Sequence, residues 1–370
     1  MSEIKVNSIK GVGASTAAIT VDNSSGSATA NLTAINSVVM PNGGPLTNRR
    51  LTINGDMRIA QRGTSSTANG FNTIDRFAVN FDSGLTEAPT QAQVALASSD
   101  TPYSSGFRYA LKITNGNQTS IDANDYIQIA HTIEAQDIAQ SGWNYTSSSS
   151  NITLSFWVKA SIAQTMYVRL NAEDASSSDA RAFSFAFSAT TSWTKITKTI
   201  AGNSTLVFNN DTGRGLALYI IPYYGTNYTT SGHTNDAWVV DSGSDQVTDM
   251  ANTWFSGNDA TLEVTGVQLE VGSVATDFEF RSFGQELALA QRYFEVGGVY
   301  HSSATASGAV GRTNIQFTTT KRADPTVTIT ISSGTTGTLL HDSTSGFCYR
   351  SRGSLVGDST EFSFTADSEL

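Results

Sequence analysis

The sequence predicts a mainly β protein: an antiparallel β-sandwich, one short joining helix and a second, smaller C-terminal β domain. Short segments of alternating apolar and polar residues recur between Gly, Asn and Ser breaks, which is typical of antiparallel sandwiches. The chain has 31 Gly against 6 Pro. Its many Ser, Thr and Asn residues disfavour helices, because their side chains compete for backbone hydrogen bonds. No helical segments alternate with the strands, which argues against a parallel sheet.

Length and charge narrow the function classes. The 370 residues can bury a large core. The net charge is −10 and no cluster of Lys and Arg is present, so nucleic acid is not an expected partner. No apolar run approaches the roughly 18 residues of a membrane span, and the first residues lack the apolar stretch of a signal peptide. Membrane insertion is therefore not expected. The single Cys348 excludes an internal disulfide.

Residues 1–50 are predicted to be an extended N-terminal segment that anchors or oligomerises the protein. Their short apolar pieces are too small to fold alone, because ordering each residue costs roughly 1–2 kcal/mol. The segment is either disordered or completed by neighbouring chains, and its periodic apolar residues favour the second state. The turn-rich residues 40–48 are predicted to be a linker. With two residues of the helix described below, the candidate oligomer or anchor residues are Ile4, Val6, Ile9, Ile19, Leu32, Leu287 and Phe294.

Residues 51–282 form the largest predicted unit, the sandwich itself. Its clearest strand is ITLSFWVKAS, residues 152–161. One face of that strand is apolar, whereas the other carries Ser155, Trp157 and Lys159. A tryptophan on the polar face is either packed under a further layer or available to touch a ligand. The segment at 51–63, LTINGDMRIAQRG, is also expected to be extended.

Residues 283–295, FGQELALAQRYFE, are predicted to be the joining helix. Apolar residues recur at helical spacing from Phe283 to Phe294, and Gly297-Gly298 should end the helix. About 12 residues are marginal as an isolated helix, so it should dock on a sheet or on copies of itself. Residues 296–370 return to alternating segments and are predicted to be the C-terminal β domain.

Motifs for catalysis and metal binding are missing from the sequence. The four histidines lack the spacing of a zinc site, and no Gly-x-Ser-x-Gly nucleophile elbow is present. His131 lies in a strand pattern and is expected to be structural. Many carboxylates could pair as in glycosidases, but sequence cannot place any two at the required separation. Neither an enzyme nor a cofactor is therefore expected. Calcium remains an open alternative at the loop 115–126, whose oxygen ligands would be Asn115, Asn117, Asp122, Asn124 and Asp125.

Aromatic residues give the clearest indication of a contact surface. Most pack in cores, where a Trp or Tyr buries a large area. The segments PYYGTNY (222–228) and SGHTNDAW (231–238) are different, because they combine aromatic and polar side chains in what we expect to be loops. The candidate host or glycan contacts are Tyr223, Tyr224, Tyr228, His233, Asn235 and Trp238.

Several ordered motifs resemble a family of tailed-bacteriophage virion proteins, the tail fibres and related appendages. They are LTINGDMRIAQRGT (51–64), TIDRF (73–77), ITLSFWVKAS, SWTKITKTIAG (192–202) and the stretch from Leu262 to Glu295. The middle region of that family is similar to carbohydrate-binding modules, so the resemblance implies a jelly-roll sandwich for residues 51–282. It also implies a homotrimer, an N-terminus attached to the virion and no catalytic residues. In jelly rolls such a strand lies centrally, so we expect Trp157 to be partly covered by a neighbouring element or subunit.

The resulting hypothesis is a structural component of a phage virion, assembled in the bacterial cytoplasm. A short trimeric tail fibre would dock on tail or capsid proteins by its N-terminus and contact a host-surface glycan or envelope protein with its distal domains. Three alternatives remain open: a capsid decoration or knob, a carbohydrate-binding module attached to a sugar-acting enzyme, and a polysaccharide depolymerase. Weak single sites would suffice for a fibre, since several copies multiply avidity.

Overall fold

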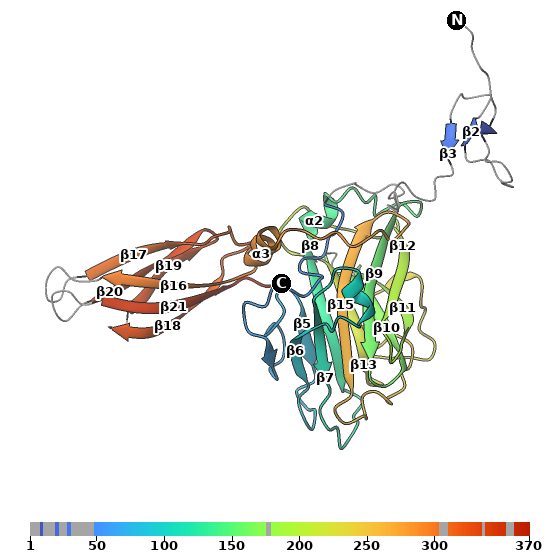
Figure 1. Ribbon diagram of the computed structural model, residues 1–370, viewed down its shortest axis with the longest axis horizontal. Coiled ribbons are helices and arrows are strands. Elements are labelled where there is room, and N and C mark those ends of the chain that lie inside the picture. Colours follow the sequence, from blue (N-terminus) through green and yellow to red (C-terminus); the bar gives the residue numbers. More distant parts are fainter. Residues whose placement is uncertain are drawn as a thin grey trace, which may run out of the picture.

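The computed structural model confirms a mainly β, antiparallel fold. It describes residues 8–9, 19–21, 28–30, 48–174, 179–302, 310–334, 337–352 and 359–370. A large sandwich carries a narrower C-terminal β domain that projects from one end (Figure 1). Within the described residues, no helix is both long and apolar enough to cross a membrane.

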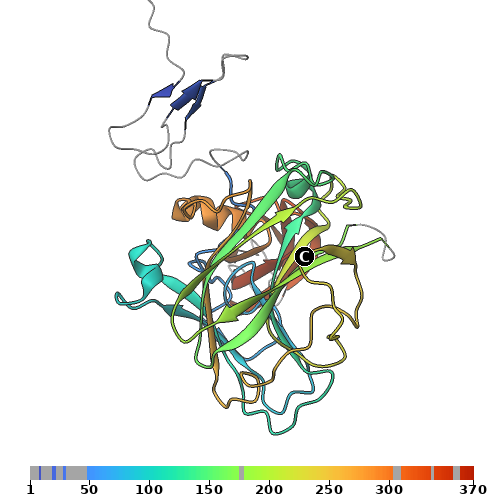
Figure 2. The same ribbon diagram turned by 90° about the vertical axis from the view of Figure 1, so that its right-hand side faces the viewer.

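Two six-stranded antiparallel sheets form the layers of the sandwich (Figures 1 and 2). The first sheet has the order β14-β11-β10-β13-β8-β5, with β5 (Ala78–Phe81), β8 (Tyr126–Glu134), β10 (Gln164–Ala172), β11 (Arg181–Ala189), β13 (Arg214–Tyr224) and β14 (Trp238–Val240). The second has the order β12-β9-β15-β7-β6-β4, with β4 (Ser65–Ser66), β6 (Thr90–Ala95), β7 (Tyr109–Thr114), β9 (Asn151–Ala160), β12 (Thr194–Ala201) and β15 (Thr261–Val271). The chain crosses repeatedly between the sheets, as in a jelly roll.

The apolar core lies between the two sheets because each strand alternates its side chains. In β9, the inward residues Ile152, Leu154, Phe156 and Val158 are each 0% exposed. Strands β10, β11 and β13 face them with Leu, Ile, Val and Phe residues in one continuous cluster. Fully burying such a side chain contributes about 1.5–3 kcal/mol, so this core dominates the stability of the sandwich.

The C-terminal domain consists of two three-stranded antiparallel sheets. One has the order β16-β21-β18, with β16 (Phe294–Ser302), β21 (Ser359–Asp367) and β18 (Thr326–Gly334). The other has the order β17-β20-β19, with β17 (Val310–Gln316), β20 (Gly346–Arg352) and β19 (Gly337–Ser343). A small aromatic core joins the sheets, made of Phe317, Phe347, Tyr349, Phe362 and Phe364 with Ala366.

The joining helix is shorter than the sequence predicts. Helix α3 spans Phe283–Gln291 and begins with a capping box between Ser282 and Gln285. Phe294 already pairs with Asp367 in β16, so the prediction of helix to residue 295 is wrong. Gly297-Gly298 lies inside β16 rather than ending the helix, because ladder bonds to β21 compete with helix continuation. Two further helices of one turn, α1 (Thr101–Ser104) and α2 (Ala135–Ala139), were not predicted.

The segment 51–63 is not a strand, contrary to the prediction, but a series of turns that fills a buried polar junction. Asn54 has a φ of 58°, and its side-chain amide donates to the carbonyls of Ile59 (2.8 Å) and Asp75 (2.9 Å). Arg50, directly before the segment, pairs with Glu286 of α3, and both side chains are 0% exposed. The Asn54 N–H also donates to Glu286, so the segment and the residue before it attach the helix to the sandwich.

The end of the chain returns to the same junction. Arg62 and Arg76 of the sandwich side pair with Glu369, and Arg62 also lies 3.0 Å from Asp367. Glu134, at the end of β8, accepts hydrogen bonds from Arg292 (2.7 and 2.8 Å) and from the Tyr293 hydroxyl (2.6 Å). Burial opposes the ionisation of Glu134, but these hydrogen bonds prevail and lower its pKa. Ion pairs thus hold the C-terminal domain to the sandwich.

The described part of the N-terminal segment forms a small three-stranded sheet. Strand β1 (Ser8–Ile9) pairs with β2 (Ile19–Val21), which pairs with β3 (Ala28–Ala30). The register places Ile9 opposite Ile19. Ile4, Val6 and Leu32 lie outside the described residues.

Candidate functional site

The outer surface of the first sheet gathers tyrosines, and we call it the tyrosine face. It consists of Tyr126 on β8, Tyr167 on β10, Tyr219 and Tyr224 on β13, and Tyr228 just after β13. Alternation places these rings outside, because their chain neighbours in the same strands point into the core. Ring centroids of Tyr126 and Tyr228 are 5.7 Å apart, and those of Tyr224 and Tyr228 are 5.4 Å apart.

The segment after β13 covers part of this face. Val247, which is 0% exposed, packs in one cluster with Tyr167, Ile221 and Tyr224. Tyr167 and Tyr224 are consequently buried, whereas Tyr126, Tyr219 and Tyr228 remain half-buried with part of each ring in solvent. The face therefore offers three partly accessible rings rather than five.

Polar groups on the tyrosine face largely bond to one another. The Tyr219 hydroxyl donates to Glu173 Oε1 (2.9 Å), and the Tyr224 hydroxyl donates to Gln128. Arg169 pairs with Asp241. Burial raises the pKa of both Tyr219 and Tyr224, so these phenols stay protonated and act as hydrogen-bonding groups.

Tyr223, a predicted contact residue, belongs to the core instead. Its ring stacks on Phe255 with centroids 4.1 Å apart, and it is 5% exposed. The register of β13 against β8 shifts between Ile220 and Tyr223, which turns Tyr223 inward and Tyr224 outward. Residues 222–224 are strand rather than loop. The exposed contact expected of Tyr223 and Tyr224 is therefore wrong for this fold, and Tyr228 remains accessible.

His233 and Asn235 fasten the covering segment to β11. His233 Nε2 lies 2.6 Å from the Ser184 hydroxyl, and its Nδ1 lies 2.8 Å from Asp245 Oδ1. The Asn235 amide donates to the Thr248 hydroxyl at 2.7 Å. His233 is 9% exposed, so its evident role is to position the loop, and contact of Asn235 with a ligand remains a prediction.

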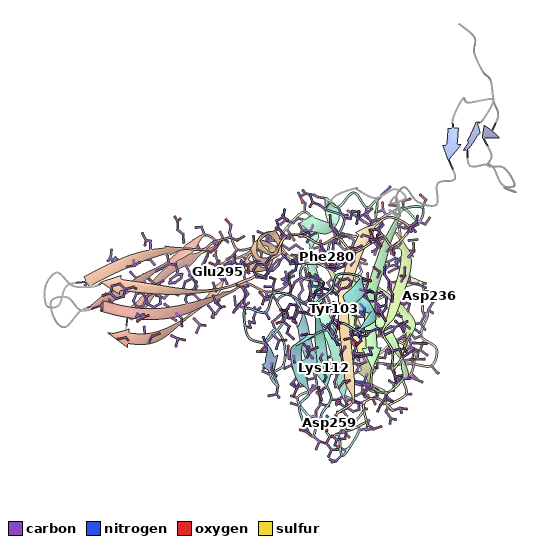
Figure 3. The ribbon with its side chains drawn as sticks, viewed as in Figure 1. Tyr103, Lys112, Asp236, Asp259, Phe280 and Glu295 are labelled. Carbon is purple, nitrogen blue, oxygen red and sulfur yellow. The ribbon has the colours of Figure 1, made fainter. Side chains whose placement is uncertain are left out.

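Trp238 occupies a different edge of the sandwich. Its indole nitrogen donates to the carbonyl of Ala201 (2.9 Å), and its ring packs against Phe183. It borders a hollow of about 370 Å³ together with Lys198 and Asp236, the latter labelled in Figure 3. Lys198 and Asp236 form an ion pair. The structure thus separates Trp238 from the tyrosines with which the sequence grouped it.

The two helix-region residues predicted for oligomer contact pack within their own chain. Phe294 is 5% exposed and lies beneath the Arg62 guanidinium, 3.5 Å from its ring centroid. Leu287 packs with Ile53 and Tyr293 in a small cluster under α3. Burial of Phe294 leaves it no free surface for a partner, which corrects that prediction.

His131 is structural, as predicted. It is buried between the backbone N–H of Ile53 (3.3 Å from Nε2) and the carbonyl of Arg76 (3.0 Å from Nδ1). Burial lowers its pKa well below the ordinary value, so it is neutral. Trp157 is half-buried, and its cover comes from the same chain, namely Tyr103, Phe107 and Phe278.

The loop proposed for calcium uses its side chains within the chain. The Asn115 amide donates to the Phe255 carbonyl, and Asp125 accepts from the Asp122 N–H (2.7 Å). Across the ranges that the structure describes, no three His, Cys, Asp or Glu residues gather as metal ligands. Calcium binding here remains a prediction.

No protein-family model and no curated protein sequence matches the chain. Among solved structures it is similar to the family 11 carbohydrate-binding module of the cellulase Lic26A-Cel5E from Clostridium thermocellum (8% identity, 57% of this chain, 95% of that chain, TM-score 0.28). It is also similar to the CBM22-1 xylan-binding domain of Paenibacillus barcinonensis Xyn10C (11% identity, 57% and 94% coverage, TM-score 0.27). Likenesses of this size carry no inference about ligands.

Proposed function

We propose that this protein is a non-catalytic carbohydrate-binding component of a phage virion, and that its tyrosine face contacts glycans. One observation carries the proposal: Tyr126, Tyr219 and Tyr228 expose part of their rings on one sheet face, next to the polar side chains of Gln128 and Glu173. Aromatic faces pack on the apolar C–H face of a sugar ring, while amides and carboxylates bind its hydroxyls.

The virion setting is supported by the motif resemblance and by the small N-terminal sheet. Its three strands have only two or three residues each, shorter than the usual five or six. A neighbouring copy or a virion protein would add apolar contacts to this small sheet. We propose a homotrimer that docks by this segment and turns the sandwich and C-terminal domain toward the host.

The glycan proposal is tested with the purified full chain and a panel of soluble bacterial polysaccharides by affinity electrophoresis. We expect retardation by at least one polysaccharide. The double substitution Tyr126→Ala and Tyr219→Ala should weaken that affinity about tenfold, which corresponds to about 1.4 kcal/mol. Tyr300→Ala is the matched control, because Tyr300 is 71% exposed on the C-terminal domain.

Two outcomes would contradict the tyrosine face as the site: equal binding by the double variant, or no retardation by any polysaccharide. Thermal unfolding of each variant shows whether a loss of binding reflects a loss of fold. Light scattering tests the assembly separately. A mass of three 39.2 kDa chains is expected, whereas a monomer would exclude the trimeric fibre and favour a single binding module.

A further inference from the structure

We infer that the opposite sheet carries a second, independent binding site for a single sugar residue, which we call the Trp157 pocket. It is a hollow of about 380 Å³ on the outer face of the second sheet. Its lining includes Phe107, Ser155, Trp157, Lys195, Asp277 and Phe280. The volume lies within the range of about 300–1,000 Å³ that is usual for small-ligand sites.

The floor of the pocket comes from adjacent strands. Trp157 of β9 stands opposite Lys195 of β12 on one side and opposite Thr265 of β15 on the other. Strand β15 bulges after Thr265, and Gly266 there has a φ of 66°. A Cβ at Gly266 would lie 2.7 Å from the Phe107 ring and 3.2 Å from the Trp157 ring. The glycine bulge therefore lets both aromatic rings approach the sheet.

Two segments wall the pocket, and both are held in place by the chain. Phe107 follows α1, while Phe278 and Phe280 come from the segment after β15. Their three ring centroids lie 4.8 to 5.1 Å apart. Figure 3 labels Tyr103 and Phe280 on these two segments. The second wall is fixed because buried Gln268 accepts from the Glu279 N–H (2.8 Å). The aromatic wall is thus preformed rather than assembled by a ligand.

The Ser104 hydroxyl in the lining donates to the Thr101 carbonyl (2.8 Å), but four other polar groups of this pocket form no such bond, unlike most of those on the tyrosine face. Ser155 is only 3% exposed, and its hydroxyl forms no hydrogen bond with any described residue. Within the same described ranges, the Trp157 indole N–H, the Lys195 ammonium and the Asp277 carboxylate are also unpaired. A nearly buried hydroxyl that opens into a hollow is a group that an incoming ligand can satisfy.

A pyranose residue matches this combination of groups. The phenylalanine rings and Trp157 offer apolar faces, while one donor-acceptor hydroxyl, two donors and one carboxylate can bind ring hydroxyls. An apolar side chain of a protein partner fits less well, since it would cover Ser155 without bonding to it. The site is on the opposite layer of the sandwich from the tyrosine face and stands whether or not that face binds glycans.

The test uses the full chain labelled with fluorinated tryptophan and followed by fluorine NMR. The five tryptophans give separate signals, and Trp157→Phe identifies that of residue 157. Methyl glucoside, methyl galactoside, methyl N-acetylglucosaminide and glucuronate are titrated at millimolar concentrations. We expect at least one to shift the Trp157 signal saturably, while the buried Trp143 and Trp254 signals stay in place.

Ser155→Ala separates ligand binding from folding. Losing one hydrogen bond should weaken the sugar about fivefold to tenfold, while thermal stability stays equal or rises because the hydroxyl has no partner to lose. Trp193→Phe is the control, since Trp193 belongs to the same apolar cluster as Trp157 but lies outside the lining. The proposal is overturned if no sugar shifts the Trp157 signal saturably, or if Ser155→Ala binds as tightly as the unaltered chain. Repeating the titration with Tyr126→Ala and Tyr219→Ala should leave the Trp157 shift unchanged.

Discussion

The two outer faces of the sandwich use similar residues in opposite ways. On the tyrosine face, the hydroxyls, the amide and the ion pair mostly bond to each other, as Tyr219 does with Glu173. In the Trp157 pocket, Ser155 and Lys195 bond to nothing among the described residues. The comparison teaches that polar groups can serve stability on one face and remain available on the other. We therefore expect the loss of a hydrogen-bonded polar group on the first face to cost folding free energy, and the loss of an unpaired polar group in the pocket to cost binding.

The largest effect on stability is expected at Gly266, which shapes both the β15 bulge and the Trp157 pocket. Gly266→Ala should destabilise the protein by about 2–3 kcal/mol, because it strains a positive φ and pushes on the Phe107 ring. Gly243→Ala is the control, since nothing lies within 4 Å of a Cβ there. Denaturant unfolding measures both, and equal midpoints would show that the bulge is not needed.

The second-largest effect on stability is expected in the polar junction between the sandwich and the C-terminal domain. Burial raises the pKa of Asp75 to about 6. Because the folded pKa exceeds the unfolded one, the folded state binds this proton more tightly, and stability should fall as pH rises from about 4 to 6, by on the order of 2 kcal/mol. Asp75→Asn should remove this slope in a series of unfolding curves. An unchanged slope would assign the pH dependence to another group.

A smaller effect on the tyrosine face tests the first half of the comparison. Tyr224→Phe removes the hydroxyl that donates to Gln128, and we expect a loss of about 1 kcal/mol. Chemical denaturation of this variant beside Tyr300→Phe, at an exposed position, isolates the hydrogen bond. Equal stability of the two variants would mean that this face is not held by its own polar groups.

The smallest effect tests the second half of the comparison, namely that polar groups of the Trp157 pocket do not contribute to stability. Lys195→Ala should change the folding free energy by no more than about 0.5 kcal/mol, because the ammonium pairs with no described group. The same unfolding assay applies. A loss above about 1 kcal/mol would show that the pocket, too, is built for stability.

Sequence reasoning located the strands where alternation is regular and failed where it is interrupted. The period of two predicted the buried face of β9 correctly. It could not reveal the irregularity between Ile220 and Tyr223, which exchanges the inner and outer tyrosines. It also missed Tyr126, whose position beside Tyr224 depends on pairing between β8 and β13. The alternation of apolar and polar residues can be read from a single sequence. Which strands pair with each other cannot.

The prediction of a strand at residues 51–63 failed for a related reason. The apolar residues of this segment suggested a strand. However, Arg62 and the preceding Arg50 pair with Glu369 and Glu286, more than two hundred residues away, and Asn54 bonds across a tight turn. From sequence alone, charged residues in an extended segment are expected to face solvent. Only the tertiary structure shows that these charges are buried together.

The way the C-terminal domain is attached has a mechanical consequence. Strand β16 leaves the sandwich directly beside the point where β21 returns to it, with Phe294 opposite Asp367. Arginine ion pairs hold the last residue of β21, Asp367, and Glu369 just after it. A force applied to the far tip of that narrow domain would be transmitted along two neighbouring strands to one cluster of ion pairs. Because the side chains of Arg62, Arg76 and Glu369 are almost fully buried, added salt should weaken this attachment only slightly.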